Sequence, residues 1–450
     1  MKQKSLSATL WTLASFGGTQ FLRLFSNLIL TRLLLPEMFG LMAIVTVVRV
    51  GVYMCSEIGL KVNIIRHEQG EDPEVLNTAW TMQTIRGVFL WVIIALISWG
   101  LSALVQHGFI PENSVYADER LPMLLFVTGA AAFISGFEST KIWLAQRNMM
   151  LARLTLLDLF AQVSGLLLMV GLAWQYQTVW ALVAGGLVGA FIKTSLSHFV
   201  LVGEKNYFCL NKQRVIEFLH FGKWLFLSAV ITFIAANGDR LILGGLLTAE
   251  QLGFYAIAYF LATALRDLVE KMIANVWFPL LSKANRDDKS TVADVYYAIR
   301  QKLDLGLYFF IGVIYVISPV IIQLLYDDRY LSATWMLQIL TVSLLPLGVR
   351  LGSSLLLVRG NPKIGTLTVV IRAIFLFLMI PWGYHNYGLE GAVWSIALNP
   401  LFEIPVVLWF FSKYRMIAWL KEIKYTPMLI LGYYFGQMML SLFVELELIL

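Results

Sequence analysis

The sequence predicts an all-α polytopic membrane protein of two parallel six-helix bundles plus a C-terminal extra helix, about 12–14 transmembrane helices in all. Three observations predict this fold class: long apolar runs, a one-sided distribution of Lys and Arg, and an internal repeat. Of the 450 residues, 59% are hydrophobic and 14% charged, whereas soluble domains average about 45–50% and about 25%. This composition excludes a soluble enzyme, and two cysteines exclude a disulfide framework.

Apolar runs of the length that spans a bilayer, about 20 residues, recur along the whole chain. Most are separated by short polar segments such as Leu35-Pro36-Glu37, which are typical of turns. The last run, 426–444, could either span the membrane or lie along its surface. The thirteen predicted spans are 7–34, 38–60, 77–106, 121–144, 151–174, 178–202, 220–247, 251–280, 304–326, 331–357, 364–384, 388–411 and 426–444.

The Lys and Arg residues predict the orientation of these spans. Numbering the loops alternately from a cytoplasmic N-terminus sorts all 34 of them into 22 inside, 3 outside and 9 within spans. Cytoplasmic loops of membrane proteins carry an excess of Lys and Arg. The ratio therefore predicts a cytoplasmic N-terminus and explains the net charge of +6 without nucleic acid.

Two distant segments, residues 27–44 and 240–257, match each other at a predicted helix–turn–helix corner. Glu37 matches Glu250 and Gly40 matches Gly253, beside seven aliphatic identities. The repeat pairs span one with span seven, so each unit holds six spans and the two units are parallel. It predicts an N-lobe of helices 1–6 over 1–203, a C-lobe of helices 7–12 over 204–415, and an extra membrane segment over 416–450. Such paired bundles favour a transporter with alternating access; a duplicated channel or membrane enzyme is the alternative.

Nine basic residues fall within the spans, and six of them are arginines near mid-span. Each costs about 2.5–3.5 kcal/mol there unless it faces an acid or water, so six would cost on the order of 15–20 kcal/mol. That exceeds the stability of a typical protein, about 5–15 kcal/mol. Because guanidinium groups bind phosphate oxygens in a bidentate manner, a cavity that they line favours a phosphate or pyrophosphate ligand. The candidate substrate-binding residues are Arg23, Arg49, Arg240, Arg266, Arg350 and Arg372.

Embedded acids could neutralise some of these cations. Arg266 and Glu270 are four residues apart and predict a structural ion pair, whereas Arg350 and Arg372 have no acid within a turn on their own helix. Lys193 and Arg86 are interpreted as interfacial, because long side chains reach out from such depths. The candidate ion-coupling residues, each weighed against plain salt bridging, are Glu57, Asp158 and Asp239.

The chain lacks the motifs of other chemistries. It contains no P-loop, no H-E-x-x-H and no metal-ligand spacing among its histidines. No cofactor, metal site or catalytic residue is therefore expected, and the chain is predicted not to be an enzyme; H⁺ or Na⁺ is the candidate coupling ion. Two G-x-x-x-G pairs, Gly185/Gly189 and Gly432/Gly436, predict close helix packing.

The corner segment Thr31 to Leu41 (TRLLLPEMFGL) resembles the first-corner signature of bacterial oligosaccharide and polysaccharide flippases, the Wzx-type branch of the MATE-like MOP superfamily. The resemblance continues at Ser56 to Leu60, Thr78 to Gly87 and Gly238 to Tyr255, and covers roughly residues 1–415. Asp239 and Arg240 fall within the last of these motifs. The proposed lumen role of Arg23, Arg49, Arg350 and Arg372 depends on the burial argument alone.

The resemblance implies two six-helix lobes around a hydrophilic, often cationic cavity. It further implies that an undecaprenyl-pyrophosphate-linked oligosaccharide is flipped across the bacterial inner membrane, by alternating access, for O-antigen, capsule or exopolysaccharide synthesis. Implied partners are the lipid-linked oligosaccharide, membrane lipids, and polysaccharide polymerase and glycosyltransferases. Two alternatives remain. A MATE-type ion-coupled exporter of small molecules should have an acidic lumen, and a membrane enzyme of polysaccharide assembly should have a long external loop.

Overall fold

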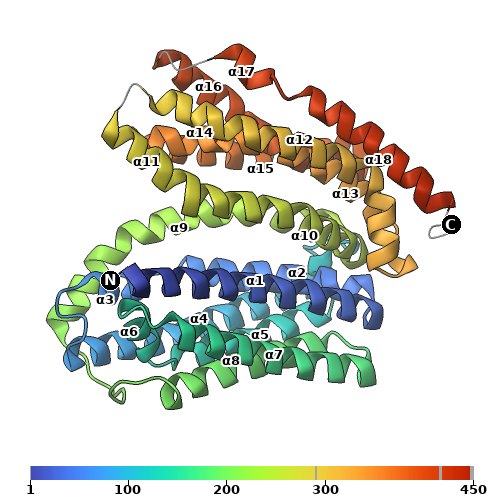
Figure 1. Ribbon diagram of the computed structural model, residues 1–450. Helices are drawn as coiled ribbons and strands as arrows, with labels where there is room; N and C mark the ends of the chain where they lie inside the picture. Colours follow the sequence, from blue (N-terminus) through green and yellow to red (C-terminus); the bar gives the residue numbers. More distant parts are fainter. Residues whose placement is uncertain (1, 289–290, 415–417, 446–450) are drawn as a thin grey trace. The chain divides into compact units, whose positions relative to one another are not determined.

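A computed structural model describes residues 2–288, 291–414 and 418–445, and every regular element in these ranges is helical (Figure 1). Ten segments of the described chain are long and apolar enough to cross a membrane, and up to eleven if a bent helix pair is one span. The expected all-α polytopic membrane fold is confirmed. The chain forms two compact units, Met1–Phe233 and Ile234–Leu450, and each is described by itself.

Unit 1 contains the first eight α-helices and most of the ninth. The helices of this unit overlap the first six predicted spans in order, although the predicted span 38–60 runs beyond the end of α2 at Met54. The predicted span 121–144 is a pair of helices, α5 and α6, bent by 63°. The elements are α1 Lys2–Leu33, α2 Pro36–Met54, α3 Leu60–Arg66, α4 Pro73–Gln106, η1 Val115–Ala117, α5 Arg120–Gly136, α6 Lys141–Arg147, α7 Leu151–Tyr176, α8 Trp180–Phe199 and α9 Lys212–Leu246.

The first half of α9 belongs to unit 1 because it packs there. Phe218 is fully buried against a cluster from α3 and α4 that includes Ile64, Val75 and Ala79. The compact units therefore divide after Phe233, within α9, whereas the expected lobe boundary at 203/204 lies in the preceding loop. The lobe assignment stays a prediction, and its second boundary, at 415/416, lies outside the described residues.

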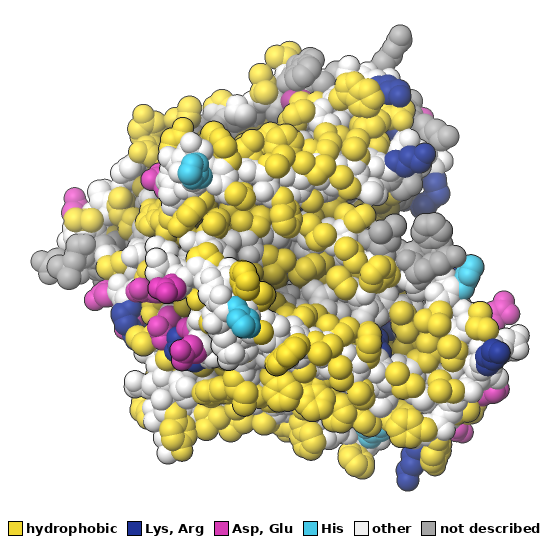
Figure 2. Space-filling model, turned by 180° about the vertical axis from the view of Figure 1, so that it is seen from behind, with side chains coloured by type: hydrophobic (Ala, Val, Ile, Leu, Met, Phe, Trp, Pro, Cys, Tyr) yellow, Lys and Arg dark blue, Asp and Glu magenta, His cyan; other side chains and the backbone are white. Residues whose placement is uncertain are grey.

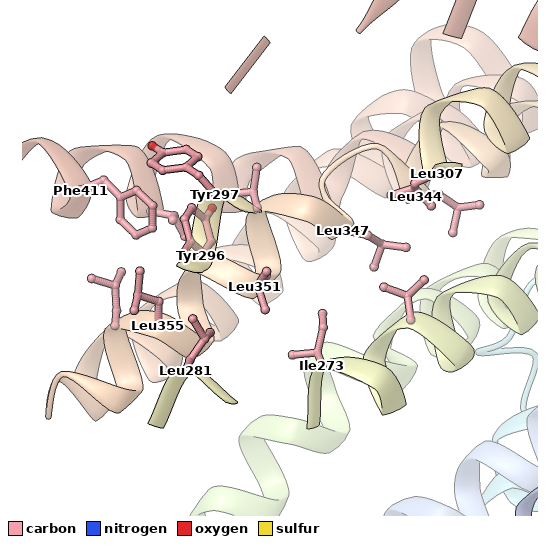
Figure 3. Close-up of a cluster of buried hydrophobic side chains, with 14 of the residues drawn as sticks. Ile273, Leu281, Tyr296, Tyr297, Leu307, Leu344, Leu347, Leu351, Leu355 and Phe411 are labelled. Atoms are coloured by element: carbon pink, nitrogen blue, oxygen red, sulfur yellow. The ribbon is translucent and has the colours of Figure 1, made fainter. Parts of the chain in front are cut away.

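Unit 2 contains the end of α9 and all later elements. A buried apolar cluster joins α10, α12, α14 and α16; Figure 3 shows Tyr296, Tyr297 and Phe411 side by side, with Leu351 and Leu355 beside them. The elements are α10 Ala249–Met272, η2 Ile273–Trp277, α11 Phe278–Asp287, α12 Val292–Leu325, η3 Asp328–Tyr330, α13 Ala333–Thr341, η4 Val342–Leu344, α14 Leu347–Val358, α15 Pro362–Leu398, η5 Asn399–Phe402, α16 Glu403–Lys413, α17 Trp419–Ile423 and α18 Pro427–Glu445.

Helix α15 is a hairpin rather than one continuous helix. The Ser395 hydroxyl donates to the Met379 carbonyl at 2.9 Å, although residues this far apart in a straight helix would be separated by about 24 Å. The chain reverses near Gly388, whose φ of 63° is the left-handed region that glycine adopts without strain. Two of the expected spans, 364–384 and 388–411, therefore lie in one apolar segment, Lys363–Lys413.

Helix α18 packs along α12 in the same direction. A Cβ at Gly432 would meet the backbone of Phe309, and one at Gly436 would meet Val313 and Val316, so both helices advance together. The close packing predicted for Gly432/Gly436 is confirmed. At the start of this helix pair, Glu422 of α17 accepts from the buried Arg300 of α12, so the last segment is an integral part of unit 2.

The internal repeat is visible in the helix boundaries. Helix α1 ends at Leu33 and α9 at Leu246, and α2 begins at Pro36 and α10 at Ala249, so both pairs of boundaries keep the offset of the sequence repeat. Figure 2 shows hydrophobic side chains over the middle of the visible face, with charged side chains gathered towards two edges. This distribution is expected of helices that cross a bilayer.

Candidate functional site

The α7–α8 hairpin of unit 1 places Asp158 and Lys193 opposite each other. A Cβ at Gly165 of α7 would lie 2.7 Å from the Gly185 carbonyl of α8, so the two helices touch backbone to backbone. Asp158 lies two turns from Gly165 and Lys193 two turns from Gly185, on the same helical faces. The glycine contact therefore directs the carboxylate and the ammonium towards one another.

A second carboxylate reaches the same lysine from the break between α5 and α6. Gln83 of α4 donates to the carbonyls of Ser135, Gly136 and Glu138 at 3.0–3.1 Å, which satisfies backbone groups that the break leaves without helical partners. The Lys193 Nζ lies 3.2 Å from Asp158 and 3.8 Å from Glu138. We call Glu138, Asp158 and Lys193 the carboxylate–lysine triad.

The triad borders a cavity of about 690 Å³ that lies within unit 1. Arg23 of α1 and Arg49 of α2 line the same cavity, so two of the predicted substrate-binding arginines meet there with the predicted ion-coupling residue Asp158. Arg49 is exposed and makes no hydrogen bond or ion pair with any residue whose side chain the structure describes. Three cations and two carboxylates give the cavity a net charge of +1.

The other acid predicted for ion coupling in this half of the chain, Glu57, lies in a different environment. Its Oε1 accepts from the Gly59 amide at 2.9 Å, and its Oε2 lies 3.4 Å from Arg86. Arg86 also donates to Ser56 and to the Tyr53 carbonyl, each at 2.9 Å. Glu57 does not line the cavity, and its contacts are those of a structural ion pair; its coupling role stays a prediction.

In unit 2, Arg240 and Arg266 converge on one aromatic ring. The guanidinium carbon of Arg240 lies 4.4 Å from the centre of the Tyr259 ring, and Arg266 donates to the Tyr259 hydroxyl at 3.2 Å. Asp239, the neighbour of Arg240, is buried and accepts from the Tyr255 hydroxyl at 2.5 Å. Adjacent residues point about 100° apart on a helix, so Asp239 and Arg240 have different partners.

Arg350 and Arg372 pair with acids that come from distant parts of the sequence. Glu403 of α16, 4% exposed, lies 3.4 Å from Arg350 and 3.9 Å from Arg372. Arg350 also pairs with Glu270 of α10, whose predicted pair with Arg266 is present at 3.9 Å. Arg350 and Arg372 therefore have acidic partners from other helices, although neither has an acid nearby on its own helix. Together with Arg266, three arginines share the two glutamates.

Two members of the triad could not be selected from the sequence. Glu138 reaches the cavity because the chain breaks between α5 and α6, and this break was not predicted. Lys193, which was interpreted as interfacial, lines the cavity. One signal for Lys193 is present: Gly185, Gly189 and Lys193 are spaced by four, so a lysine continues the glycine stripe that faces α7. The close packing predicted for Gly185/Gly189 is confirmed.

Within the described residues, no group of three or more His, Cys, Asp or Glu side chains could hold a metal ion.

Comparison with known proteins gives a family match and several distant relatives. The family model described as "Polysaccharide biosynthesis protein" matches residues 29–335. The lipopolysaccharide biosynthesis protein WzxC of Escherichia coli (strain K12) is 22% identical over 450 residues, covering 97% of this chain and 88% of the relative. The teichuronic acid biosynthesis protein TuaB of Bacillus subtilis (strain 168) is 21% identical over 396 residues, covering 83% of this chain and 76% of the relative.

Two solved structures share the fold. The lipid II flippase MurJ in an inward closed conformation has a TM-score of 0.66 at 15% identity, covering 95% of this chain and 92% of that one. An inward-facing multidrug resistance MATE transporter of the MOP superfamily has a TM-score of 0.66 at 16% identity, covering 88% of this chain and 94% of that one. At this level of identity the likeness concerns the fold.

Proposed function

We propose that this chain, which belongs to the polysaccharide biosynthesis protein family, flips an undecaprenyl-pyrophosphate-linked oligosaccharide. It is a multi-pass, Wzx-type flippase of the MOP superfamily and not an enzyme. The flipping occurs by alternating access in the bacterial inner membrane, with the N-terminus in the cytoplasm. The glycan then enters O-antigen, capsule or exopolysaccharide synthesis, where a polymerase and glycosyltransferases are the partners.

The observation that carries the proposal is the cationic cavity of unit 1. Arg23, Arg49 and Lys193 line it, and Arg49 makes no ion pair with the described side chains. A guanidinium that faces a cavity and has no carboxylate partner can bind an anion without first breaking an ion pair. The planar fork of arginine suits the oxygens of a pyrophosphate.

The arginines of unit 2 support the same proposal in a different way. Arg266, Arg350 and Arg372 pair with only two glutamates, Glu270 and Glu403. A phosphate that approached this group would compete with the two glutamates for the guanidinium groups. In this role the arginines would bind the substrate by exchanging a glutamate partner for a phosphate. Mutation of each arginine tests this role.

The test is complementation of a strain that lacks the gene. We expect the null strain to accumulate lipid-linked repeat units on the cytoplasmic face and to lose surface polysaccharide. Arg49→Ala should reduce export about 10- to 100-fold, as expected when a charge-assisted hydrogen bond of about 1.5–3 kcal/mol is lost. Arg49→Lys should retain part of it, because the charge remains without the fork.

Arg329→Ala is the matched control, because Arg329 of η3 is a partly exposed arginine that pairs with Asp327 at 3.1 Å and does not line the cavity. It should export normally at equal protein level. Normal polymer export in the null strain, together with increased drug sensitivity, would instead identify a MATE-type exporter. Unchanged export by Arg49→Ala would remove Arg49 from the substrate site.

A further inference from the structure

We propose that Lys193 exchanges partners during transport. Its ammonium moves from Glu138 and Asp158 to the phosphate of the bound head group, so that binding of the anion is linked to uptake of a proton by the two carboxylates. This inference rests on the proposed function and assigns the coupling ion as H⁺. The carboxylates that Lys193 leaves accept the proton from solvent, and they release it when the lysine returns.

The geometry allows the exchange. Lys193 and Asp158 are 36% and 38% exposed, and both line the cavity that also contains Arg23 and Arg49. The lysine side chain has a flexible four-carbon stem, so rotation about its bonds can move the ammonium from one partner to another. The three N–H donors of the ammonium can form hydrogen bonds in either position. The lysine therefore needs no movement of α7 or α8, which the glycine contact holds together.

The charge balance gives the direction of proton movement. Asp158 and Glu138 lie 3.2 and 3.8 Å from the same Nζ, so one ammonium holds both carboxylates close to each other. With the ammonium between them the triad carries −1. Without it, two carboxylates share one site, and like charges so close together cannot easily both stay ionised. About one proton is expected to replace the lysine.

The other charged groups near the triad do not substitute for Lys193. Arg86, from α4, is held by Ser56, Glu57 and the Tyr53 carbonyl. Tyr53 of α2 is within electrostatic reach of Glu138 and Lys193 but carries no charge at neutral pH. Arg23 and Arg49, from α1 and α2, line the cavity, so they and the released lysine would bind the phosphate together.

Linkage makes the exchange measurable. If binding of the anion raises proton uptake, protons must raise the affinity for the anion by the same coupling. Anion affinity should therefore increase as the pH falls, with a slope of about one decade per pH unit while one proton is taken up. An anion site that merely contained three fixed cations would show no such proton uptake.

The experiment is isothermal titration calorimetry of the full chain in lipid nanodiscs with farnesyl pyrophosphate as the probe. At pH 8, where the probe is ionised, titrations in two buffers of different ionisation enthalpy give the number of protons exchanged. We expect uptake of about one proton by the wild type. Lys193→Met should bind at least tenfold more weakly and take up less than about 0.3 proton, because its carboxylates already share a proton.

Lys421→Met is the matched control, since Lys421 also pairs with an aspartate, Asp294, at 3.4 Å but lies in unit 2. It should match the wild type in affinity and proton uptake. The double variant Glu138→Gln/Asp158→Asn keeps the lysine, so it should bind the probe more tightly with no uptake; it decides the matter if Lys193→Met does not fold.

The outcomes separate the two proposals. Binding by the wild type without proton uptake, or with equal uptake by the double variant, overturns the partner exchange and leaves the flippase proposal standing. A wild-type protein that does not bind the probe at all overturns the anion site, and the exchange with it.

Discussion

At the scale of single residues, the partly exposed ion-pair cluster around Arg120 in unit 1 leads to a prediction about the pH dependence of stability. Arg120 donates to Asp118 at 2.8 and 3.0 Å and to Glu37, at the first residues of α2, at 3.0 Å. Burial alone would raise the pKa of the Asp118 carboxyl, but the hydrogen bonds and charge of Arg120 outweigh burial and lower that pKa. The stabilisation is therefore present above the pKa of an unfolded aspartate, about 3.9, and is lost as pH falls through the lower folded value.

We therefore predict that Arg120→Met lowers the unfolding temperature at pH 7 and that the difference from wild type shrinks towards pH 3. Unfolding temperature measured in detergent across this range checks the prediction. A difference that is the same at both pH values would show that Arg120 acts through packing and not through the Asp118 carboxylate.

Residues also show where sequence reasoning stops. The predicted pair Arg266/Glu270 is present because it depends on helical spacing alone. The partners of Arg350 could not be predicted, because Glu403 and Glu270 lie on other helices and reach it only through helix packing. The number of mid-span arginines indicates that they need acidic partners or water. Whether a given arginine meets an acid or water depends on how the helices pack, which the sequence alone does not specify.

At the scale of elements, the packing of α18 on α12 makes the next prediction. A Cβ at Gly432 of α18 would meet the backbone of Phe309 of α12, whereas a Cβ at Gly306 of α12 would meet nothing within 4 Å. Gly432→Ala should destabilise the protein by about 1–3 kcal/mol through overpacking. Gly306→Ala should be neutral or stabilising by about 0.5–1 kcal/mol, because alanine favours the helix.

Thermal unfolding of the two variants in detergent checks this prediction. Equal unfolding temperatures would mean that α18 does not pack on α12 in solution, and the 426–444 segment would then be free to lie at the membrane surface. The sequence predicted the glycine pair correctly because G-x-x-x-G spacing reports helix contact directly, but it did not identify the partner helix.

At the scale of the whole molecule, the repeat was the most informative sequence feature. The corners at Leu33–Pro36 and Leu246–Ala249 lie where the repeat predicted them. Turn chemistry and hydropathy determine such corners locally, so they can be read from the chain. The boundary between compact units could not be, because Phe218 of α9 packs on α3 and α4, which lie far earlier in the chain.

The central claim is that the basic side chains of the unit 1 cavity carry an anionic lipid head group across the bilayer. The most direct measurement uses proteoliposomes that contain a fluorescent undecaprenyl-pyrophosphate-linked glycan and a membrane-impermeant quencher added outside. With the wild type, labelled lipid from the inner leaflet should flip to the outer leaflet, so that the quencher reaches nearly all of it. With Arg23→Gln/Arg49→Gln, the lipid of the inner leaflet should stay protected, as in protein-free vesicles. Equal quenching by the double variant and the wild type, or no flipping by the wild type, would contradict the claim.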